Sequence, residues 1–203
     1  MIVGPRYKIC KRLGNSVFEK CQTQKYTVSE SRRGMGRGGR RPRQLSDYGK
    51  QLLEKQRVRF TYGISEKQLS GYVKTATAKG GDPVTRLRQL LEMRLDNVVF
   101  RLGLASTRRA ARQMVSHGHI RVNGGKVTVP SYQTKVGDNI TVKDKSKDSP
   151  LFKELEEHQK EHRAPQWLLF NEKKLEGTIK SLPSTEDAET AYDLTVVMEF
   201  YSR

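Results

Sequence analysis

Residues 94–129 read RLDNVVFRLGLASTRRAARQMVSHGHIRVNGGKVTV, and this stretch decides the fold class. Leucine and valine recur at helical spacing over residues 87–102, which predicts a helical core face that Gly103 can end as a C-cap. Thr107 can cap a second helix, and Gly118 stops it. The stretch therefore predicts two helices in succession.

A short sheet is predicted directly after these helices. Alternating apolar residues flank the Asn123–Gly124 pair, which is the strongest short-range signal of a β-hairpin. A second turn at Gly137–Asp138 leads into a further strand that ends near Val142. The helices and strands together predict an α+β module, in which two helices pack on a small antiparallel sheet.

The sequence before this module is predicted to be helical. Ser46 can cap one helix, and Ser65 can start another before a break at residues 80–83, GGDP. Near the other end of the chain, the segment Leu194–Tyr201 allows two interpretations. Its side chains alternate as in a strand, but Asp193 before it is a fair helix cap.

The charge of the chain indicates a polyanionic partner. The 203 residues include 39 Lys and Arg against 22 Asp and Glu, a formal net charge of +17. The surplus is confined to residues 1–127, which carry a formal +20, while residues 128–203 carry −3. This distribution favours a surface that binds nucleic-acid phosphates; a surplus that serves only solubility is the alternative.

The most basic tract is residues 32–43, RRGMGRGGRRPR, where six Arg alternate with Gly. Gly disfavours a helix there, and guanidinium groups so close together repel one another unless phosphates lie between them. We therefore expect this tract to contact RNA. The alternative is a disordered, solvated linker.

A second basic group begins the second predicted helix. Arg108 and Arg109 occupy its first turn and Arg112 the next, where the helix dipole disfavours cations. This placement is explained if guanidiniums and backbone N–H groups bind one phosphate together; a solvated face without a ligand is the alternative. His117 and His119 either contact RNA or pack in the following turn. The candidate RNA-binding residues are Arg32, Arg33, Arg37, Arg40, Arg41, Arg43, Lys50, Lys55, Arg57, Arg59, Arg94, Arg108, Arg109, Arg112, His117 and His119.

The sequence carries no signal for catalysis or membrane insertion. It has no nucleophile–base pair, phosphate-binding loop motif or metal-spaced set of His, Asp and Glu. The acidic segment 153–161 predicts a charged, solvent-facing helix. No apolar run approaches the ~20 residues that span a bilayer, and basic residues interrupt the N-terminus where a secretory signal needs an apolar core. We therefore expect neither an enzyme nor a cofactor-dependent or membrane protein.

Three segments of the central stretch, RLDNVVFRLG, RRAARQMVSHGHI and VNG, resemble the small RNA-binding module named after small-subunit ribosomal protein four. That module also occurs in some pseudouridine synthases, a tyrosyl-tRNA synthetase and a heat-shock RNA-binding protein, so by itself it leaves the function open. Further segments are similar to the bacterial-type family of small-subunit ribosomal protein four: SDYG (46–49), EKQRVR (54–59), YGISEKQ (62–68), APQWL (164–168) and EFYSR (199–203). The resemblance runs from GPRYK near the N-terminus to the last residue.

This resemblance implies both a domain arrangement and a function. The domains would be a basic N-terminal extension, 1–45, a helical domain, 46–91, completed by 179–203, and an embedded RNA-binding domain, 92–178. The protein would be a structural constituent of the small ribosomal subunit. As a primary binder of the 5′ domain of 16S-type rRNA, it would nucleate assembly.

The resemblance also implies partners and a location. Contacts are expected with ribosomal protein five and other small-subunit proteins, together with a part in translational accuracy. Messenger RNA would pass near Arg40, Arg41 and Arg43, where it enters the subunit. The expected location is the cytoplasmic ribosome of a bacterium, with an organellar ribosome as the alternative.

Many members of this family hold zinc with four cysteines near the N-terminus. At the corresponding positions this chain has Tyr7, Cys10, Cys21 and Tyr26, so two of the four ligands are replaced. We therefore expect no zinc, and we expect the two cysteines to be reduced and packed as small apolar groups. One tightly held zinc ion per chain in a metal assay would contradict this.

Two other functions are weighed against a ribosomal role. An RNA-modifying enzyme anchored by the module, such as a pseudouridine synthase, would need a large catalytic domain with an Asp nucleophile, but the sequence on both sides of the module is helical and basic. A free regulatory RNA-binding protein would be absent from isolated small subunits. Incubation with labelled RNA tests for an RNA-modifying enzyme, and sedimentation of a lysate tests for a free RNA-binding protein.

Overall fold

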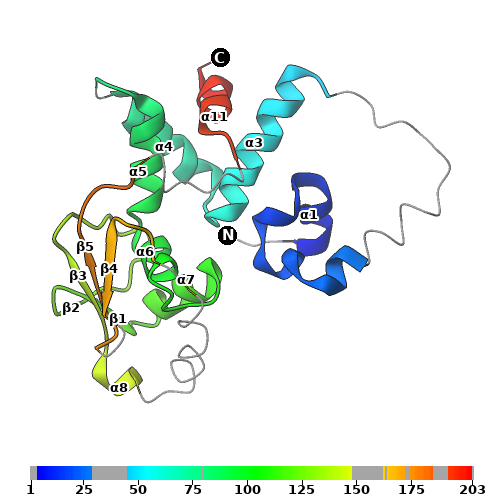
Figure 1. The fold of residues 1–203 in the computed structure, drawn as a ribbon. Helices are drawn as coiled ribbons and strands as arrows, with labels where there is room; N and C mark the ends of the chain where they lie inside the picture. The colour runs from blue at the N-terminus through cyan, green and yellow to red at the C-terminus, as the bar shows by residue number, and fades with distance from the viewer. Residues whose placement is uncertain are drawn as a thin grey trace. The chain divides into compact units, whose positions relative to one another are not determined.

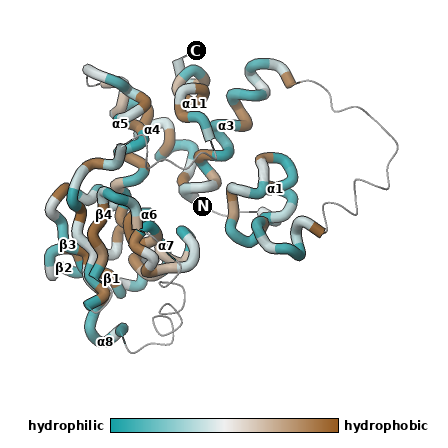
Figure 2. Tube along the Cα trace, viewed as in Figure 1, coloured by the Kyte–Doolittle hydropathy of each residue, from teal (hydrophilic) through white to brown (hydrophobic). Residues whose placement is uncertain are grey.

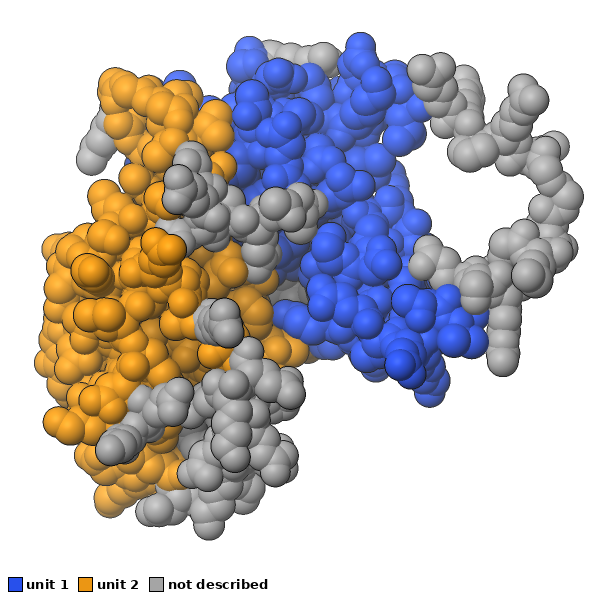
Figure 3. Space-filling model, viewed as in Figure 1, with its two compact units in different colours: residues 1–77, 189–203 blue, residues 78–188 orange. Residues whose placement is uncertain are grey.

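The computed structural model describes residues 4–28, 45–78, 80–147, 162, 164–171, 174–184 and 192–202 (Figure 1). The Arg-Gly tract and the acidic segment 153–161 lie outside these ranges. The chain forms two compact units, of which unit 1 comprises Met1–Thr77 and Glu189–Arg203 and unit 2 comprises Ala78–Ala188 (Figure 3). These limits differ from the boundaries that we expected after residues 91 and 178, since the helix at residues 83–92 lies in unit 2.

Unit 1 is helical. Its elements are α1 (Arg6–Leu13), the 3-10 helices η1 (Asn15–Val17) and η2 (Glu19–Gln22), α3 (Asp47–Thr61), α4 (Glu66–Ala78, which reaches the boundary) and α11 (Leu194–Tyr201). Ser46 Oγ accepts a hydrogen bond from the backbone N–H of Gly49, so the predicted cap of α3 is confirmed. α11 packs against α3, and Val58 and Val197 are fully buried in this unit.

The segment that ends the chain is a helix and not a strand. Asp193 Oδ1 accepts a hydrogen bond from the backbone N–H of Thr195 at 2.8 Å and caps α11. Leu194 and Val197 are buried three residues apart, a spacing that places both side chains on one face of a helix. Of the two interpretations that the sequence allowed, the helix is therefore correct.

A polar cluster holds α11 to α3 and α4. Lys55 has a side chain that is only 9% exposed, and its Nζ lies 2.9 Å from Glu66 Oε1 and 4.4 Å from the centre of the Phe200 ring. The hydroxyl of Tyr201 donates a hydrogen bond to the same carboxylate oxygen at 2.7 Å. Burial raises the pKa of Glu66, but hydrogen bonds from Tyr201 and Lys55 and two nearby cations outweigh it and lower this pKa below its ordinary value.

We expect Glu66→Gln to reduce the stability that unit 1 loses when the pH falls into the acid range. A carboxylate with a lowered folded pKa stabilises the fold above its unfolded pKa of ~4.3, and this stability is lost as pH falls through the folded pKa. The variant should therefore be less stable than the wild type at neutral pH and lose less stability on acidification. Urea denaturation across the acid range measures both effects, and pH profiles that run parallel would contradict the prediction.

Cys10 and Cys21 form a disulfide, which corrects the expectation that both are reduced. The fold of α1, η1 and η2 brings their Cα atoms to 6.5 Å, and no pattern in the first 31 residues indicated this approach. The two side chains are 2% and 0% exposed and pack with Tyr26. The ring of Tyr26 stacks on that of Tyr7 at a centroid distance of 5.5 Å, so the two tyrosines form an aromatic pair. Within the described ranges, no group of three or more His, Cys, Asp and Glu could hold a metal ion.

Unit 2 is an α+β unit with one antiparallel sheet. Its elements are α5 (Pro83–Glu92), α6 (Leu95–Arg101), α7 (Arg108–Ser116), α8 (Asp144–Lys147), β1 (Ile120–Val122), β2 (Gly125–Lys126), β3 (Asn139–Val142), β4 (Leu168–Asn171) and β5 (Glu176–Ile179). The strand order is β2-β1-β3-β5-β4, and all neighbours are antiparallel. α6 and α7 lie on one side of the sheet, and apolar residues gather there (Figure 2). The predicted fold class is confirmed.

The predicted hairpin is present, although its second strand is short. Asn123 and Gly124 have positive φ angles of 50° and 79°, as a tight hairpin turn requires. Asn123 also binds the second predicted turn, since its Nδ2 donates to Asp138 Oδ1 at 2.8 Å and its Oδ1 accepts from Asn139 N at 2.8 Å. Beyond the two residues of β2 the strand does not continue, and Val129 is 54% exposed.

α5 and α6 are separate helices, although their apolar residues repeat at one helical spacing. Arg94 lies between them in an extended conformation and forms a β-bridge with Gln133. The N–H of Leu95 donates to the carbonyl of Tyr132 at 2.9 Å instead of continuing α5. A loop distant in sequence thus breaks the helix that the apolar pattern would extend.

The middle of β5 packs directly on α6, because Gly177 has no side chain. A Cβ at Gly177 would lie 2.4 Å from Cδ1 of Leu102, which is 1% exposed and has no room to move away. We expect Gly177→Ala to destabilise unit 2 by about 1–3 kcal/mol through overpacking. Fluorescence of Trp167, the one tryptophan of the chain and 2% exposed, follows the urea denaturation of this unit.

Gly80→Ala is the matched control for this substitution. Gly80 is an exposed residue of unit 2 before α5, with nothing within 4 Å of a built Cβ. The control should be close to neutral, so a similar loss in both variants would contradict the packing explanation.

Candidate nucleic-acid interface

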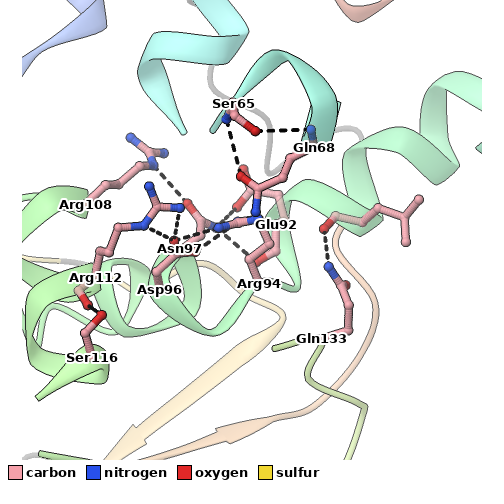
Figure 4. A network of polar contacts seen from close by, with 11 residues as sticks. Ser65, Gln68, Glu92, Arg94, Asp96, Asn97, Arg108, Arg112, Ser116 and Gln133 are labelled. Atoms are coloured by element: carbon pink, nitrogen blue, oxygen red, sulfur yellow. Dashed lines mark hydrogen bonds and ion pairs between the residues drawn. The ribbon is translucent and has the colours of Figure 1, made fainter. Parts of the chain in front are cut away.

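α7 presents three arginines from its first two turns. Thr107 Oγ1 accepts a hydrogen bond from the backbone N–H of Ala110 at 3.1 Å and caps the helix, as predicted. Arg109 is exposed, whereas Arg108 and Arg112 are half-buried and run toward α6 (Figure 4). The first turn of α7 contains no acidic residue to offset these charges.

One buried carboxylate on α6 holds two guanidinium groups. Arg94 Nε and Nη2 donate to the two oxygens of Asp96 at 3.0 and 2.8 Å. Arg112 Nε and Nη2 both lie on Asp96 Oδ2, at 3.1 and 2.9 Å (Figure 4). The side chains of Arg94 and Asp96 are 0% and 5% exposed, so this contact ties α7 to the core of unit 2.

A second buried carboxylate, that of Glu92, is linked to Arg108 through the side-chain amide of Asn97. Glu92 pairs with Arg101 through two hydrogen bonds of 3.1 Å. Asn97 donates an N–H to Glu92 Oε2 at 2.8 Å, and its Oδ1 accepts from Arg108 Nε at 2.9 Å (Figure 4). The guanidinium carbon of Arg108 lies 4.5 Å from the centre of the Phe100 ring. Arg108 is thus held by a neutral amide and an aromatic face.

These residues form the α6–α7 cluster, which consists of Glu92, Arg94, Asp96, Asn97, Phe100, Arg101, Arg108 and Arg112. Its eight residues include four guanidinium groups and two carboxylates. The carboxylates bind Arg94, Arg101 and Arg112, and α7 also carries the exposed Arg109. Such a surface is suited to phosphate groups, which accept charge-assisted hydrogen bonds from guanidinium.

Two predicted RNA contacts are buried instead, and their assignment is corrected. The side chain of Arg94 has no exposed surface and is paired with Asp96. The side chain of Lys55 is 9% exposed and is paired with Glu66. Since a buried cation that leaves its anion costs several kcal/mol, ~3–5 kcal/mol in measured cases, both residues hold the fold together and do not offer a surface to RNA.

The other candidates in unit 1 lie nearer the surface but have acidic partners. Lys50 pairs with Asp47, Arg57 with Glu54, and Arg59 with Glu66. Of these cations Lys50 is the most accessible, with 59% of its side chain exposed. The six arginines of the tract 32–43 lie outside the described residues, so their contact with RNA stays a prediction.

The two histidines lie at the turn after α7 with different surroundings. Their rings stack at a centroid distance of 6.1 Å, with His117 exposed and His119 half-buried. His119 Nδ1 lies 3.0 Å from Ser146 Oγ, which favours packing for this residue. Lys126, which we did not predict, crosses over Gly118, where a Cβ would lie 2.3 Å from its Cε. Only the hairpin brings this lysine beside the histidines, and no local sequence signal reveals it.

Comparisons with known proteins assign these features to a family. Residues 2–92 match the family model described as "Ribosomal protein S4/S9 N-terminal domain", and residues 93–140 match the "S4 domain". The small ribosomal subunit protein uS4 of Chloroflexus aurantiacus is 45% identical over 203 residues, which are 99% of this chain and 98% of the relative. The chain belongs to the uS4 family of small-subunit ribosomal proteins. Protein uS4A of Alkaliphilus metalliredigens is 42% identical and protein uS4 of Roseiflexus castenholzii 44%, over 97% and 99% of this chain and 96% and 98% of the relatives.

As a member of the uS4 family, the chain is a structural ribosomal protein and not an enzyme. The matched S4 domain includes α6, α7, β1, β2 and the first two residues of β3, so it contains all of the α6–α7 cluster except Glu92. The predicted family is confirmed. None of the helices in the described part of the chain has the length and apolarity to cross a bilayer.

Proposed function

We propose that this uS4 family chain is a primary binder of the 5′ domain of 16S-type rRNA and that this contact nucleates assembly of the small subunit. The observation that carries the proposal is the group of three arginines on α7, of which Arg108 and Arg112 are hydrogen-bonded to α6 and Arg109 is exposed. The match to the S4 domain supports RNA as the polyanion. The bacterial relatives support the cytoplasmic ribosome of a bacterium as the location.

We expect the affinity for RNA and the selectivity for one RNA over another to have different physical origins. Affinity should come from neutralised phosphates, so log K should fall linearly with log salt by about 0.9 for each contact. Selectivity should come from the shape of an RNA junction, because the deep groove of paired RNA hides its base edges.

A comparison of two transcripts tests the proposal. The full chain is titrated with the 5′ domain and with an equally long 3′-domain transcript over a range of salt. We expect tighter binding to the 5′ domain and a steep salt slope with both. Equal affinity for the two transcripts at every salt concentration would overturn the proposed target, and absence of the chain from sedimented small subunits would favour a free RNA-binding factor.

The same proposal includes partners and a role in accuracy. We infer contacts with ribosomal protein five and other small-subunit proteins, and with messenger RNA near Arg40, Arg41 and Arg43. Membership of the uS4 family supports these partners. Cross-linking in isolated subunits identifies the contacts, and misreading by ribosomes that carry alanine at the three arginines measures the role. Unchanged accuracy would contradict a part in decoding.

A further inference from the structure

We propose that unit 2 binds RNA with a second surface, the open face of its sheet, which lies on the side opposite to α6 and α7. The basic part of this surface, the hairpin face, consists of Arg121 on β1, Lys126 on β2 and Thr141 on β3. This inference rests on the proposed function and extends it to a second place of contact with the same RNA. None of the three residues was a candidate in the sequence.

The alternation of side chains along the strands separates the two faces of the sheet. Ile120 and Val122 on β1, and Ile140 and Val142 on β3, are buried in one core with residues of α6 and α7. The side chains of the opposite face alternate with these and are all half-buried or exposed: Arg121, Lys126, Asn139, Thr141, Leu169, Asn171, Glu176 and Thr178. The core thus lies between the open face and the arginines of α7, so one phosphate cannot contact both.

The strand register brings two cations together on the hairpin face. Arg121 pairs with Lys126 on β2 and with Thr141 on β3, so the three side chains form one row across three strands. Like charges directly opposite each other destabilise a sheet, and an anion bound between them removes this cost. The side chain of Lys126 reaches the turn after α7, where a Cβ at Gly118 would lie 2.3 Å from its Cε. Two cations and a hydroxyl donor in one row suit the oxygens of an RNA backbone.

The acidic residues Glu176 and Asp144 lie near the hairpin face, but each has another position or partner. Glu176 on β5 pairs with Thr141, so one strand separates it from Arg121. Asp144 Oδ1 lies 3.0 Å from Lys147 Nζ. The pKa of Asp144 is lowered first by the hydrogen bond from Lys147 and only to a smaller extent by the charge of Arg121. The row therefore has its cations at the β1–β2 end and its carboxylate beyond β3.

The composition of the hairpin face favours RNA over a protein partner. The core of a protein interface is enriched in aromatic residues and depleted of charge, whereas this row offers two cations and a hydroxyl. Leu169, an apolar residue of the same face, is 56% exposed but lies on β4, at the other edge of the sheet. Basic surfaces on opposite sides of one packed unit suit an RNA junction, where separate helices lie close together, better than they suit a single helix.

Salt titrations of the full chain with two RNAs test this second surface: the 5′-domain transcript and a plain RNA duplex. The neutral variant is Arg121→Gln with Lys126→Gln, and the charge-keeping variant is Arg121→Lys with Lys126→Arg. The matched control is Lys135→Gln with Lys180→Gln, which removes the same charge from exposed residues of unit 2 outside β1 and β2. Urea denaturation followed by Trp167 fluorescence checks that each variant is folded.

With the 5′-domain transcript, the neutral variant should bind roughly 10- to 100-fold more weakly at about 0.1 M salt. The slope of log K against log salt should fall by about 0.9 for each lost contact, and the charge-keeping variant should retain the wild-type slope. Combination of the neutral variant with Arg108→Ala and Arg109→Ala should multiply the losses, because the two surfaces contact different parts of the RNA. A plain duplex can occupy one surface at a time, so with this RNA the neutral variant should lose at most about twofold.

A loss in the neutral variant no larger than that in the control would overturn the second surface and leave the proposed function in place. The same loss in the charge-keeping variant, or an equal loss with the plain duplex, would overturn it as well, since neither depends on two separate phosphate contacts. Unchanged RNA binding together with absence of the neutral variant from assembled subunits would mean that a protein occupies this face instead. If the wild type does not bind the 5′-domain transcript, the proposed function itself fails.

Discussion

Asp96→Asn is expected to destabilise unit 2 by about 3–5 kcal/mol, the cost of removing one partner from a buried ion pair. The carboxylate is 5% exposed and receives two guanidinium groups, of which that of Arg94 has no exposed surface. Arginine cannot lose its proton to escape this penalty, and an amide places a donor against donors. Urea denaturation followed by Trp167 fluorescence measures the loss.

Asp138→Asn is the control, because it removes a buried carboxylate that has no cationic group among the two hydrogen-bond donors described here. Asp138 is 9% exposed in the same unit, and its oxygens accept 2.8 Å hydrogen bonds from the neutral N–H groups of Asn123 and Lys135. One of these hydrogen bonds would be lost, which costs ~1–2 kcal/mol. If Asp96→Asn is no more harmful than Asp138→Asn, the ion pairs of the cluster do not hold α6 and α7 together.

Arg108→Ala combined with Arg109→Ala should weaken binding to the 5′-domain transcript by roughly two orders of magnitude near 0.1 M salt. Each lost phosphate contact removes about 0.9 from the slope of log K against log salt, so the slope should fall by almost two. The fold should largely survive, because Asp96 keeps Arg94 and Arg112 as partners. Filter binding over a range of salt measures the affinity and the slope.

Lys67→Ala combined with Lys74→Ala removes the same charge from an exposed face of α4 and serves as the control. If affinity depended on net charge alone, both double variants would lose it equally. We expect only a small loss in the control, because we propose no phosphate contact for either lysine and the salt slope depends on the cations that contact phosphates.

The elements that the sequence predicted are those whose partners lie close by in the chain. Caps at Ser46 and Thr107 satisfy N–H groups within three residues, and the Asn123–Gly124 turn needs no distant contact. The helix at the end of the chain was ambiguous because its side chains also alternate. The cap at Asp193 decided it.

β4 and β5 were not predicted, because their local signals are weak. Leu168 and Leu169 are adjacent and equally apolar, yet one is 4% and the other 56% exposed. The turn before β5 places Leu175 at a φ of 53°, where glycine or asparagine would have marked it. What makes these strands is pairing with β3, a contact between segments distant in sequence.

The sequence also predicted the basic helix α7, but not the residues of α6 that bind its arginines. It shows the charge of Arg94 and Lys55, which were expected to contact RNA, but not that both are buried. Asp96 and Asn97 lie within the stretch that decides the fold class, yet no role was predicted for either. Their partners Arg112 and Arg108 are 16 and 11 residues away, and only the packing of α6 on α7 brings these groups together.

The insertion of unit 2 between the two parts of unit 1 has a consequence for biosynthesis. A nascent chain emerges from its N-terminus, and domains usually close in that order. Here the inner unit is complete once residue 188 has been translated, while α3 still lacks α11, which is made later. Termination after residue 188 but before α11 would release a chain with a complete inner unit and an incomplete outer one. Such a fragment would expose the apolar surface of α3 that α11 otherwise covers, and exposed apolar surface of this kind is what chaperones and proteases recognise.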